Sequence, residues 1–303
     1  MGNPLIKPKR LLPGDTIGVV APAGYVDHNT LHRGVEQLAR LGFHVLLGRH
    51  VEKRYRYLAG VDAERAEDLQ TMIQNPEIRA IFCARGGFGT ARVIPYLQTR
   101  KIVGSPKIFM GSSDITTLLI WLTHTVGWVA FHGPMVATQF GQHSTKEAED
   151  IFLRVLSGDV VEMNFPGVIP LRGGTAQGVL TGGCLTLLCT TIKTAYEIDT
   201  EDRILFLEDT DEAPYRIDRM LTYLKGLKKF DHVRGVIFGQ MSKCQPDQLP
   251  EIILDVLGEF DFPILFGFPS GHGDATATLP FGIPVAFDTT NAILKMREPA
   301  VSA

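Results

Sequence analysis

The chain has 303 residues, which at about 150 residues per domain predicts two domains or one large one. With 45% hydrophobic and 21% charged residues, the composition excludes a disordered chain. The formal net charge is −3 and basic residues do not cluster, so we expect no nucleic-acid partner. The cysteines are scattered and form no CxxC pair, which argues against a disulfide scaffold or a zinc ribbon. They are Cys83, Cys184, Cys189 and Cys244.

The N-terminal segment, MGNPLIKPKRLLPGD, carries basic residues without a following apolar region, so it does not resemble a secretory signal. The longest apolar stretch, residues 115–130, is interrupted by Thr and His and is too short to span a bilayer. We therefore expect a cytoplasmic protein with no membrane partner.

The first half of the chain alternates apolar strand-like runs with segments of helical periodicity. Strands are predicted at 16–21, 44–47, 80–84 and 107–110, and helices at 31–41, 62–73, 90–97 and from about 115. Such alternation predicts βαβ units and a parallel sheet. Ligands of such sheets bind at the carboxyl ends of the strands, so chemistry is expected in the turns after Ala21, Ala84 and Met110.

The pattern of apolar and polar residues changes after residue 140. A charged helix at 146–156 is followed by a stretch rich in Gly, Pro and Val, where we place a linker at 158–177. This divides the chain into an N-terminal α/β domain, residues 1–157, and a C-terminal β-rich domain, residues 178–303. In the second domain we predict strands at 204–207, 235–238, 263–266 and 284–287, and helices at 215–227 and 250–257.

The first candidate site is the run Gly-Ser-Ser-Asp at 111–114, between a buried strand and an apolar helix. A sharp turn there would expose the hydroxyl of Ser113 beside helix N-terminal amides, as in a nucleophile elbow. Ile115 departs from the G-x-S-x-G pattern of α/β-hydrolases. Capping of the following helix by Ser112, Ser113 or Asp114 explains the same residues, and spacing alone favours capping.

The second candidate is the loop Arg-Gly-Gly-Phe-Gly at 85–89, also between a strand and a helix. Glycines let the backbone approach a ligand, and amides at a helix start attract anions. The loop fits neither G-x-G-x-x-G nor the P-loop pattern, so nucleotide binding is not expected. A plain tight turn explains it equally well.

The third and fourth candidates lie in the second half. Glu208 directly follows a four-residue apolar strand and needs a partner if buried, so it would suit the orienting member of a triad. Asp209, Asp211 and Glu212 precede a helix, where acidic side chains are electrostatically favoured. His272 lies between two glycines in a loop and, with His132, is one of two histidines beside a loop glycine.

Two histidines, His28 and His32, have HxxxH spacing, but Asn29 occupies the position of the zincin glutamate. No third ligand lies near them in the sequence. We therefore predict no metal site.

Together these segments resemble the LD-carboxypeptidase family of muramoyl-tetrapeptide serine peptidases, which includes relatives of the microcin C self-immunity protein. The resemblance covers nearly the whole chain and includes LPGDTIGVVAPA at 12–23, YLAG at 57–60, RGGFG at 85–89, GSSD at 111–114, HGPM at 132–135, GG at 182–183, LED at 207–209 and GHG at 271–273.

The resemblance implies Ser113 as nucleophile, Glu208 as the charge-relay residue and His272 as general base. It implies an oxyanion hole from the backbone amides of Asp114 and, in the glycine loop, Gly87. It also implies an active site in a groove between an N-terminal α/β domain and a C-terminal β-rich domain, and a homodimer. No metal or cofactor is expected.

The expected substrate is a muropeptide or small peptide, from which a serine LD-carboxypeptidase of cell-wall recycling would remove a terminal D-alanine. Arg85, with Gly86 beside it, is the candidate for binding the free carboxylate. A peptidase of nucleotide conjugates and a non-catalytic binding relative are the alternatives.

Two positions depart from the family pattern. Ser112 replaces a larger residue, which raises the question of which serine is the nucleophile, although position favours Ser113. Cys184 replaces the asparagine of a Gly-Gly-Asn run, and an altered substrate preference is expected if that asparagine supports the groove. Cys184 heads an apolar helix-like run and is expected to pack rather than to react.

Overall fold

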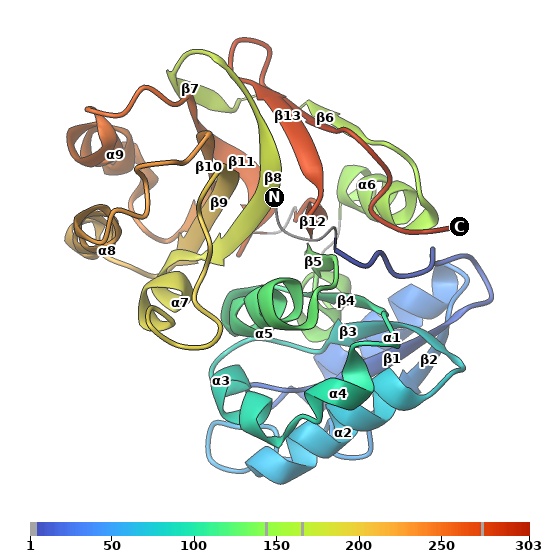
Figure 1. Cartoon of the computed structure of the whole chain (residues 1–303). Helices are drawn as coiled ribbons and strands as arrows, with labels where there is room; N and C mark the ends of the chain where they lie inside the picture. The colour runs from blue at the N-terminus through green and yellow to red at the C-terminus, as the bar shows by residue number, and fades with distance from the viewer. Residues whose placement is uncertain (1–4, 143–144, 165–166, 274–275) are drawn as a thin grey trace.

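The computed structural model describes residues 5–142, 145–164, 167–273 and 276–303, and they form two β-sheets with helices packed around them (Figure 1). One sheet is built mainly from the first half of the chain and the other from the second half. The predicted α/β class with two domains is confirmed.

The first sheet has the strand order β12-β5-β4-β3-β1-β2 within the described residues. Its strands are β1 (Thr16–Val20), β2 (His44–Leu47), β3 (Ile78–Cys83), β4 (Ile108–Gly111), β5 (Ala130–His132) and β12 (Leu279–Phe281). Strands β1 to β5 pair in parallel, as the sequence predicted. The edge strand β12 comes from the C-terminal half and pairs antiparallel to β5, so the two halves of the chain share this sheet.

The helices of the first half follow the apolar periodicity. They are α1 (His28–Arg40), α2 (Asp62–Gln74), α3 (Thr90–Val93), α4 (Thr99–Ile102), α5 (Thr116–Trp121) and α6 (Lys146–Ser157). Asp27 caps α1 by accepting a hydrogen bond from the Thr30 amide at 2.9 Å. The helix predicted at 90–97 is divided, because α3 passes into a 3₁₀ turn, Ile94–Tyr96, at Pro95, which lacks an amide hydrogen.

The second sheet has the order β6-β14-β13-β8-β9-β10-β11-β7 among the described strands. Its strands are β6 (Glu162–Asn164), β7 (Ile169–Arg172), β8 (Thr175–Cys184), β9 (Arg203–Thr210), β10 (Gly235–Ser242), β11 (Ile264–Gly271), β13 (Pro284–Asp288) and β14 (Ile293–Met296). Strands β8 to β11 are parallel, and the outer strands run antiparallel to their neighbours. The range 158–177 contains β6 and β7, which pair at the two edges of this sheet.

The helices of the second half are α7 (Leu185–Thr190), α8 (Pro214–Gly226) and α9 (Leu249–Leu257). Side chains of β9 alternate between two apolar cores, as the two-residue repeat of a strand requires. Leu205 and Leu207 pack with the buried faces of α8 and α9, whereas Ile204 and Phe206 join the core shared with the first sheet. The next residue in this alternation, Glu208, therefore falls on the side facing the first domain.

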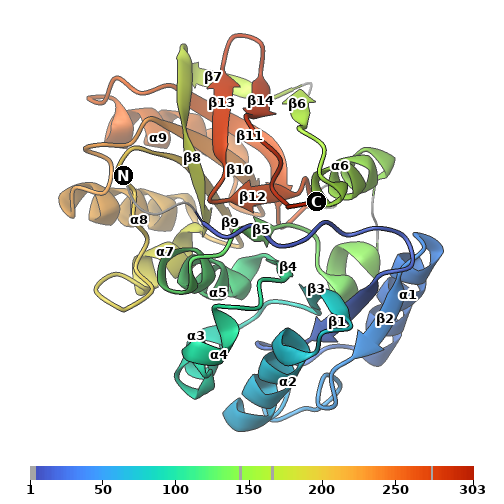
Figure 2. The ribbon, with the colours of Figure 1, turned by 45° about the vertical axis from the view of Figure 1, so that its right-hand side comes forward.

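The two domains meet where α5 packs on the end of β8 and on α7, an arrangement visible in both views (Figures 1 and 2). The amide of Cys184, at the end of β8, donates a hydrogen bond of 3.1 Å to Thr116 Oγ1 in α5. Because Thr116 is the first residue of α5, which follows β4, this bond holds the carboxyl end of β8 close to the carboxyl end of β4.

Candidate active site

Ser113 lies on a strained turn between β4 and α5. Its φ of +61° is in the left-handed region, which a non-glycine residue adopts at an energetic cost. The turn leaves Ser113 partly exposed and Ser112 buried at 2% exposure. Such a turn holds one hydroxyl out from the sheet and helix, and here that hydroxyl belongs to Ser113.

Capping does not explain this run. The N-cap residue Ser112 makes no capping hydrogen bond through its side chain. The carboxylate of Asp114 turns away from its own helix and accepts a hydrogen bond of 2.9 Å from the Thr90 amide, while Thr90 Oγ1 donates to the Asp114 carbonyl at 2.7 Å. Burial raises the pKa of Asp114, with the Thr90 hydrogen bonds opposing that effect. Asp114 thereby fastens the glycine loop to the turn that carries Ser113.

The glycine loop presses against the serine. A Cβ atom on Gly86 would lie 2.6 Å from Ser113 Cβ and 2.7 Å from Ser113 Oγ, so only glycine fits there without movement. The loop is held from the other side by the Gly24 amide, which donates to the Gly86 carbonyl at 3.0 Å. Gly87, the next residue, has a φ of +112° that favours glycine.

Two backbone amides beside Ser113 are available to a ligand. The Gly87 amide has no hydrogen-bond acceptor among the residues that the structure describes. Asp114 is the second residue of its helical turn, where an amide has no acceptor within the helix. Amides so placed can stabilise an oxyanion.

The imidazole of His272 is hydrogen-bonded to a fully buried carboxylate. His272 Nδ1 lies 2.5 Å from Glu208 Oε2, and the Glu208 side chain is 0% exposed. Burial of the imidazole disfavours its charged form, but the charge of Glu208 and this hydrogen bond outweigh burial, so the pKa of His272 is raised above its usual value. The contact fixes Nδ1 as the donor and leaves Nε2 free to act as a base.

A bulge in β10 makes this contact possible across the sheet. The register of β10 shifts near Gly239 against both β9 and β11. A Cβ on Gly239 would lie 2.5 Å from the Ser270 carbonyl, and one on Gly271 would lie 2.8 Å from Glu208 Oε2. Two glycines therefore bring β9 and the end of β11 close enough for Glu208 to reach His272.

The loop that follows β11 is tied down by two glutamines. Gln240 Oε1 accepts a hydrogen bond of 2.9 Å from the Gly273 amide, and Gln139 Nε2 donates to the Gly273 carbonyl at 3.4 Å. Because Gly273 is adjacent to His272, both contacts orient the imidazole.

The three candidate residues lie at one junction. Ser113 is three residues before Thr116, which binds the Cys184 amide, and Cys184 is the register partner of Glu208 on the adjacent strand. Among the described residues no hydrogen bond joins Ser113 Oγ to His272. Catalytic hydrogen bonds are often long before substrate binds and tighten in the complex.

His132 lies next to this junction but is buried. It is 0% exposed, with ring centroids 4.9 Å from Phe206 and 5.8 Å from Phe281, and neither ring nitrogen has a hydrogen-bond partner in the described part of the chain. Burial, with a smaller contribution from the charge of His272, lowers the pKa of His132 to about 3. His132 is therefore neutral at physiological pH.

Arg85 lies exposed at the start of the glycine loop, where Nη1 donates to the Tyr25 carbonyl at 3.0 Å. Cys184 is buried, and burial raises the pKa of its thiol well above the ordinary value, with Glu208 and Asp209 adding to the effect. A buried neutral thiol is a poor nucleophile, as predicted from its apolar context.

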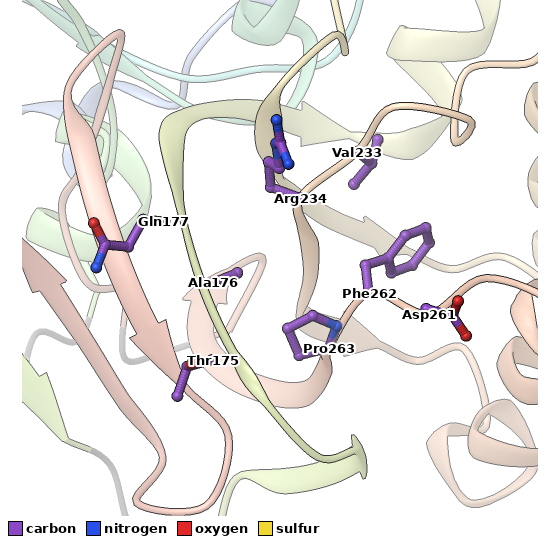
Figure 3. Close-up of a pocket in the computed structure, with 8 residues that line it drawn as sticks. All are labelled: Thr175, Ala176, Gln177, Val233, Arg234, Asp261, Phe262 and Pro263. Atoms are coloured by element: carbon purple, nitrogen blue, oxygen red, sulfur yellow. The ribbon is translucent and has the colours of Figure 1, made fainter.

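A hollow of about 400 Å³ opens in the second sheet, but at the opposite end from Glu208 (Figure 3). Thr175, Arg234 and Pro263 line it at the amino ends of β8, β10 and β11. Glu208 and His272 lie at the carboxyl ends of the parallel strands, so this hollow is separate from the candidate site.

The prediction of no metal site depended on the absence of a third ligand near His28 and His32 in the sequence. The third ligand missing from the sequence around His28 and His32 is supplied by the fold, because Glu52 contacts both histidines. This cluster uses none of the three candidate catalytic residues.

Sequence reasoning missed several residues that shape the site. Arg65 is fully buried in α2 and donates to the Gly89 carbonyl at 2.9 Å, which steadies the glycine loop from beneath. Gln240 and the bulge at Gly239 were also missed. A glycine in the apolar run 235–241 was the available signal, since glycine inside a strand often marks a bulge.

The structure thus holds the groups that a serine hydrolase requires: a serine on a strained turn, free amides beside it and a buried His–Glu pair. Residues 17–133 match the LD-carboxypeptidase N-terminal domain and residues 177–287 match the LD-carboxypeptidase C-terminal domain. The chain belongs to the LD-carboxypeptidase family and is a serine carboxypeptidase.

Known proteins are similar over almost the full length. The probable murein peptide carboxypeptidase of Bacillus subtilis is 37% identical over 292 residues, covering 93% of this chain and 92% of that protein. The murein tetrapeptide carboxypeptidase of Pseudomonas aeruginosa is 32% identical over 280 residues, covering 88% and 91%. The solved structure of MccF in complex with glutamyl sulfamoyl guanosine superposes with a TM-score of 0.91 at 27% identity, covering 98% of this chain and 100% of that chain. No helix in the described part of the chain is long and apolar enough to cross a membrane.

Proposed function

We propose that this carboxypeptidase removes the terminal D-alanine from muramoyl tetrapeptides through an acyl-enzyme on Ser113. The observation that carries the proposal is the 2.5 Å contact between His272 Nδ1 and fully buried Glu208, at the junction that also holds Ser113 on its strained turn. The named relatives in Bacillus subtilis and Pseudomonas aeruginosa support a murein peptide as substrate.

In the acylation step, His272 Nε2 accepts the proton of Ser113 Oγ while Oγ attacks the carbonyl before the terminal D-residue. Glu208 holds the imidazole tautomer and stabilises the imidazolium that forms. The amides of Gly87 and Asp114 receive the negative charge of the tetrahedral oxygen, a contribution of about 10²–10³ in rate for each donor.

The tetrahedral intermediate collapses when its C–N bond breaks and the imidazolium of His272 protonates the amine of D-alanine. Water then enters, loses a proton to His272 and attacks the ester carbonyl. Cleavage of the ester returns the proton to Ser113 Oγ and releases the shortened peptide.

A carboxypeptidase must recognise the free carboxylate of its substrate. We assign this role to Arg85, which lies at the start of the glycine loop with Gly86 next to it. One nitrogen of the Arg85 guanidinium is bonded to the Tyr25 carbonyl, and the remaining donors of its planar fork can pair with a carboxylate.

The second candidate function is cleavage of a peptidyl or aminoacyl nucleotide conjugate. The observation that favours it is the close structural similarity to MccF, which has been solved with glutamyl sulfamoyl guanosine and with aspartyl sulfamoyl adenosine. The same serine, histidine and glutamate would perform either reaction, so the two functions differ in what lies beyond the scissile bond.

We place the enzyme in the cytoplasm as a homodimer, acting in cell-wall recycling, with a domain boundary in 158–177. Sedimentation equilibrium tests the dimer, since a single species at the mass of one chain would contradict it.

The substrate is tested by measuring D-alanine release from L-Ala-γ-D-Glu-X-D-Ala tetrapeptides, where X is diaminopimelate or lysine, with and without a chelator. The same preparation is given aminoacyl nucleotide conjugates. Release of D-alanine that survives the chelator supports the first function. Conjugate cleavage without D-alanine release would move the assignment to the second, and no cleavage of either substrate by folded protein would contradict both.

A further inference from the structure

The side chains of His28, His32 and Glu52 converge on one point at the start of α1. His28 and His32 are four residues apart, so they project from the same face of the helix. Glu52 reaches them from the turn after β2. The three candidate ligand atoms all lie within 4.8 Å of one another.

One edge of this cluster has the spacing of a tetrahedral site, between His32 and Glu52. Zinc binds imidazole nitrogen and carboxylate oxygen at about 2.0–2.2 Å, which places neighbouring ligand atoms about 3.3 Å apart in a tetrahedron. His32 Nε2 lies 3.4 Å from Glu52 Oε1, which matches that separation. His28 Nδ1 is hydrogen-bonded directly to the same oxygen, so the exposed His28 side chain must move back to admit an ion. The ring centroids of the two histidines are 4.2 Å apart, which lets both nitrogens face the carboxylate.

The Nε2 atom of His32 is shielded from solvent but has no hydrogen-bond partner among the described residues. The Glu52 carboxylate lies opposite it. Enclosed polar atoms are normally satisfied, and a bound ion is one way to satisfy such a nitrogen.

Both elements that carry the ligands are fixed in place. Asp27 caps α1 and so orders its first turn. On the other element, His50 is buried, its amide donates to Asp68 Oδ2 at 2.8 Å, and its ring contacts Asp68 Oδ1 at 2.9 Å. Ligands on elements held by their own neighbours keep the geometry that a metal requires.

We propose that His28, His32 and Glu52 form a binding site for a divalent transition ion of the zinc class, with water as the fourth ligand. The His28 side chain is 69% exposed, which gives the ion a route in from solvent and leaves room for that water. Two neutral imidazoles and one carboxylate suit zinc, whereas magnesium and calcium prefer oxygen ligands alone. The ion would join α1 to the turn after β2.

The site is distinct from the proposed catalytic centre. His28 and His32 lie in α1 and Glu52 in the turn after β2, and none is a member of the serine, histidine and glutamate set. Metal binding can therefore be measured directly, and the result does not depend on which substrate the enzyme cleaves.

The test uses untagged, full-length protein stripped of metal by chelation and dialysis. Zinc is titrated by calorimetry, and cobalt is titrated by visible absorption, since its spectrum reports tetrahedral nitrogen and oxygen ligands. We expect one ion per chain and no competition from magnesium. At zinc 100-fold above its Kd, the ratio of folded to unfolded protein rises about 100-fold, seen as a higher Tm.

The variants His32→Ala and Glu52→Gln should each weaken zinc binding by at least about 100-fold and abolish the rise in Tm. The matched control is His44→Ala, because His44 is an exposed histidine on β2 outside the cluster, and it should bind zinc as the unaltered protein does. Absence of stoichiometric binding to folded protein would overturn the proposal. So would unchanged binding in a His32→Ala, Glu52→Gln double variant.

Discussion

The contact between Glu208 and His272 can be tested by the substitution Glu208→Gln, which keeps the size of the side chain and removes its charge. Two opposite charges 4 Å apart interact by about 4 kcal/mol at an effective dielectric constant of 20. The bonded atoms here are 2.5 Å apart and Glu208 is fully buried, so stabilisation of the imidazolium is of at least that order. This corresponds to about 10³ in rate.

An amide at this position can also donate a hydrogen bond, which would select the wrong imidazole tautomer. The equivalent change in a serine protease triad costs about 10⁴ in kcat. We therefore expect kcat/KM of Glu208→Gln to fall by about 10³–10⁴. The assay is D-alanine release as a function of pH.

The pH profile supplies a second, independent readout. Only neutral His272 can accept a proton, so kcat/KM should rise with pH through the pKa of His272, which lies above the ordinary value of 6.5. Without the charge and hydrogen bond of Glu208, burial lowers this pKa against only the smaller opposing effect of the Asp209 charge, so the acid limb should move to lower pH. The raised pKa also means that the pair stabilises the fold below about pH 6.5, and that this contribution is lost as pH rises through the folded-state pKa.

The matched control is Asp209→Asn, a neighbouring buried carboxylate that binds the amide and hydroxyl of Thr186. It should retain activity within about tenfold and move the acid limb less than Glu208→Gln does, because Asp209 contributes least to raising the pKa of His272. The reasoning is refuted if Glu208→Gln stays within tenfold of the unaltered enzyme or shows the same acid limb.

Other consequences concern stability, the glycine loop, the histidine loop and the cysteine. His132 has a pKa of about 3 when folded and 6.5 when unfolded, so lowering the pH from 7 to 5 should cost about 2 kcal/mol through this residue; urea unfolding of His132→Phe should lack that loss, and equal pH dependence would contradict the assignment. Gly86→Ala should lower activity by at least about 10² by displacing the nucleophile, whereas Gly104→Ala, with nothing within 4 Å of the added atom, should be silent. Gln240→Leu removes an acceptor that holds the histidine loop, and its kcat should fall about tenfold with KM little changed; an unaltered kcat would show that the loop does not need it. Native enzyme treated with iodoacetamide should remain active because Cys184 is buried, and inactivation traced to that thiol would reverse the choice of nucleophile.

Local sequence patterns predicted most of the strands and helices because each apolar run had a definite period. The runs at 204–207 and 235–238 became β9 and β10, and the carboxyl ends of such strands are where Glu208 and Ser113 lie. The grouping of Ser113, Glu208 and His272 into one site was predicted from the family resemblance. The spacing of residues alone favoured helix capping for Ser113.

The contacts that the sequence did not indicate are long-range. Strand β12 joins the first sheet although it follows β11 in the chain, and nothing in its three residues specifies that partner. Arg65 holds a loop 24 residues away, and Glu52 meets histidines 20 and 24 residues away. Such pairings depend on how whole elements pack against one another, and local sequence patterns do not predict that packing.

The central claim is that Ser113 is the nucleophile, and paired serine substitutions test it most directly. D-alanine release from the tetrapeptide is compared for the unaltered enzyme, Ser113→Ala and Ser112→Ala, each shown to be folded by circular dichroism. We predict that release vanishes with Ser113→Ala and persists with Ser112→Ala, whose side chain is buried. Release by folded Ser113→Ala, or its loss only with Ser112→Ala, would contradict the account.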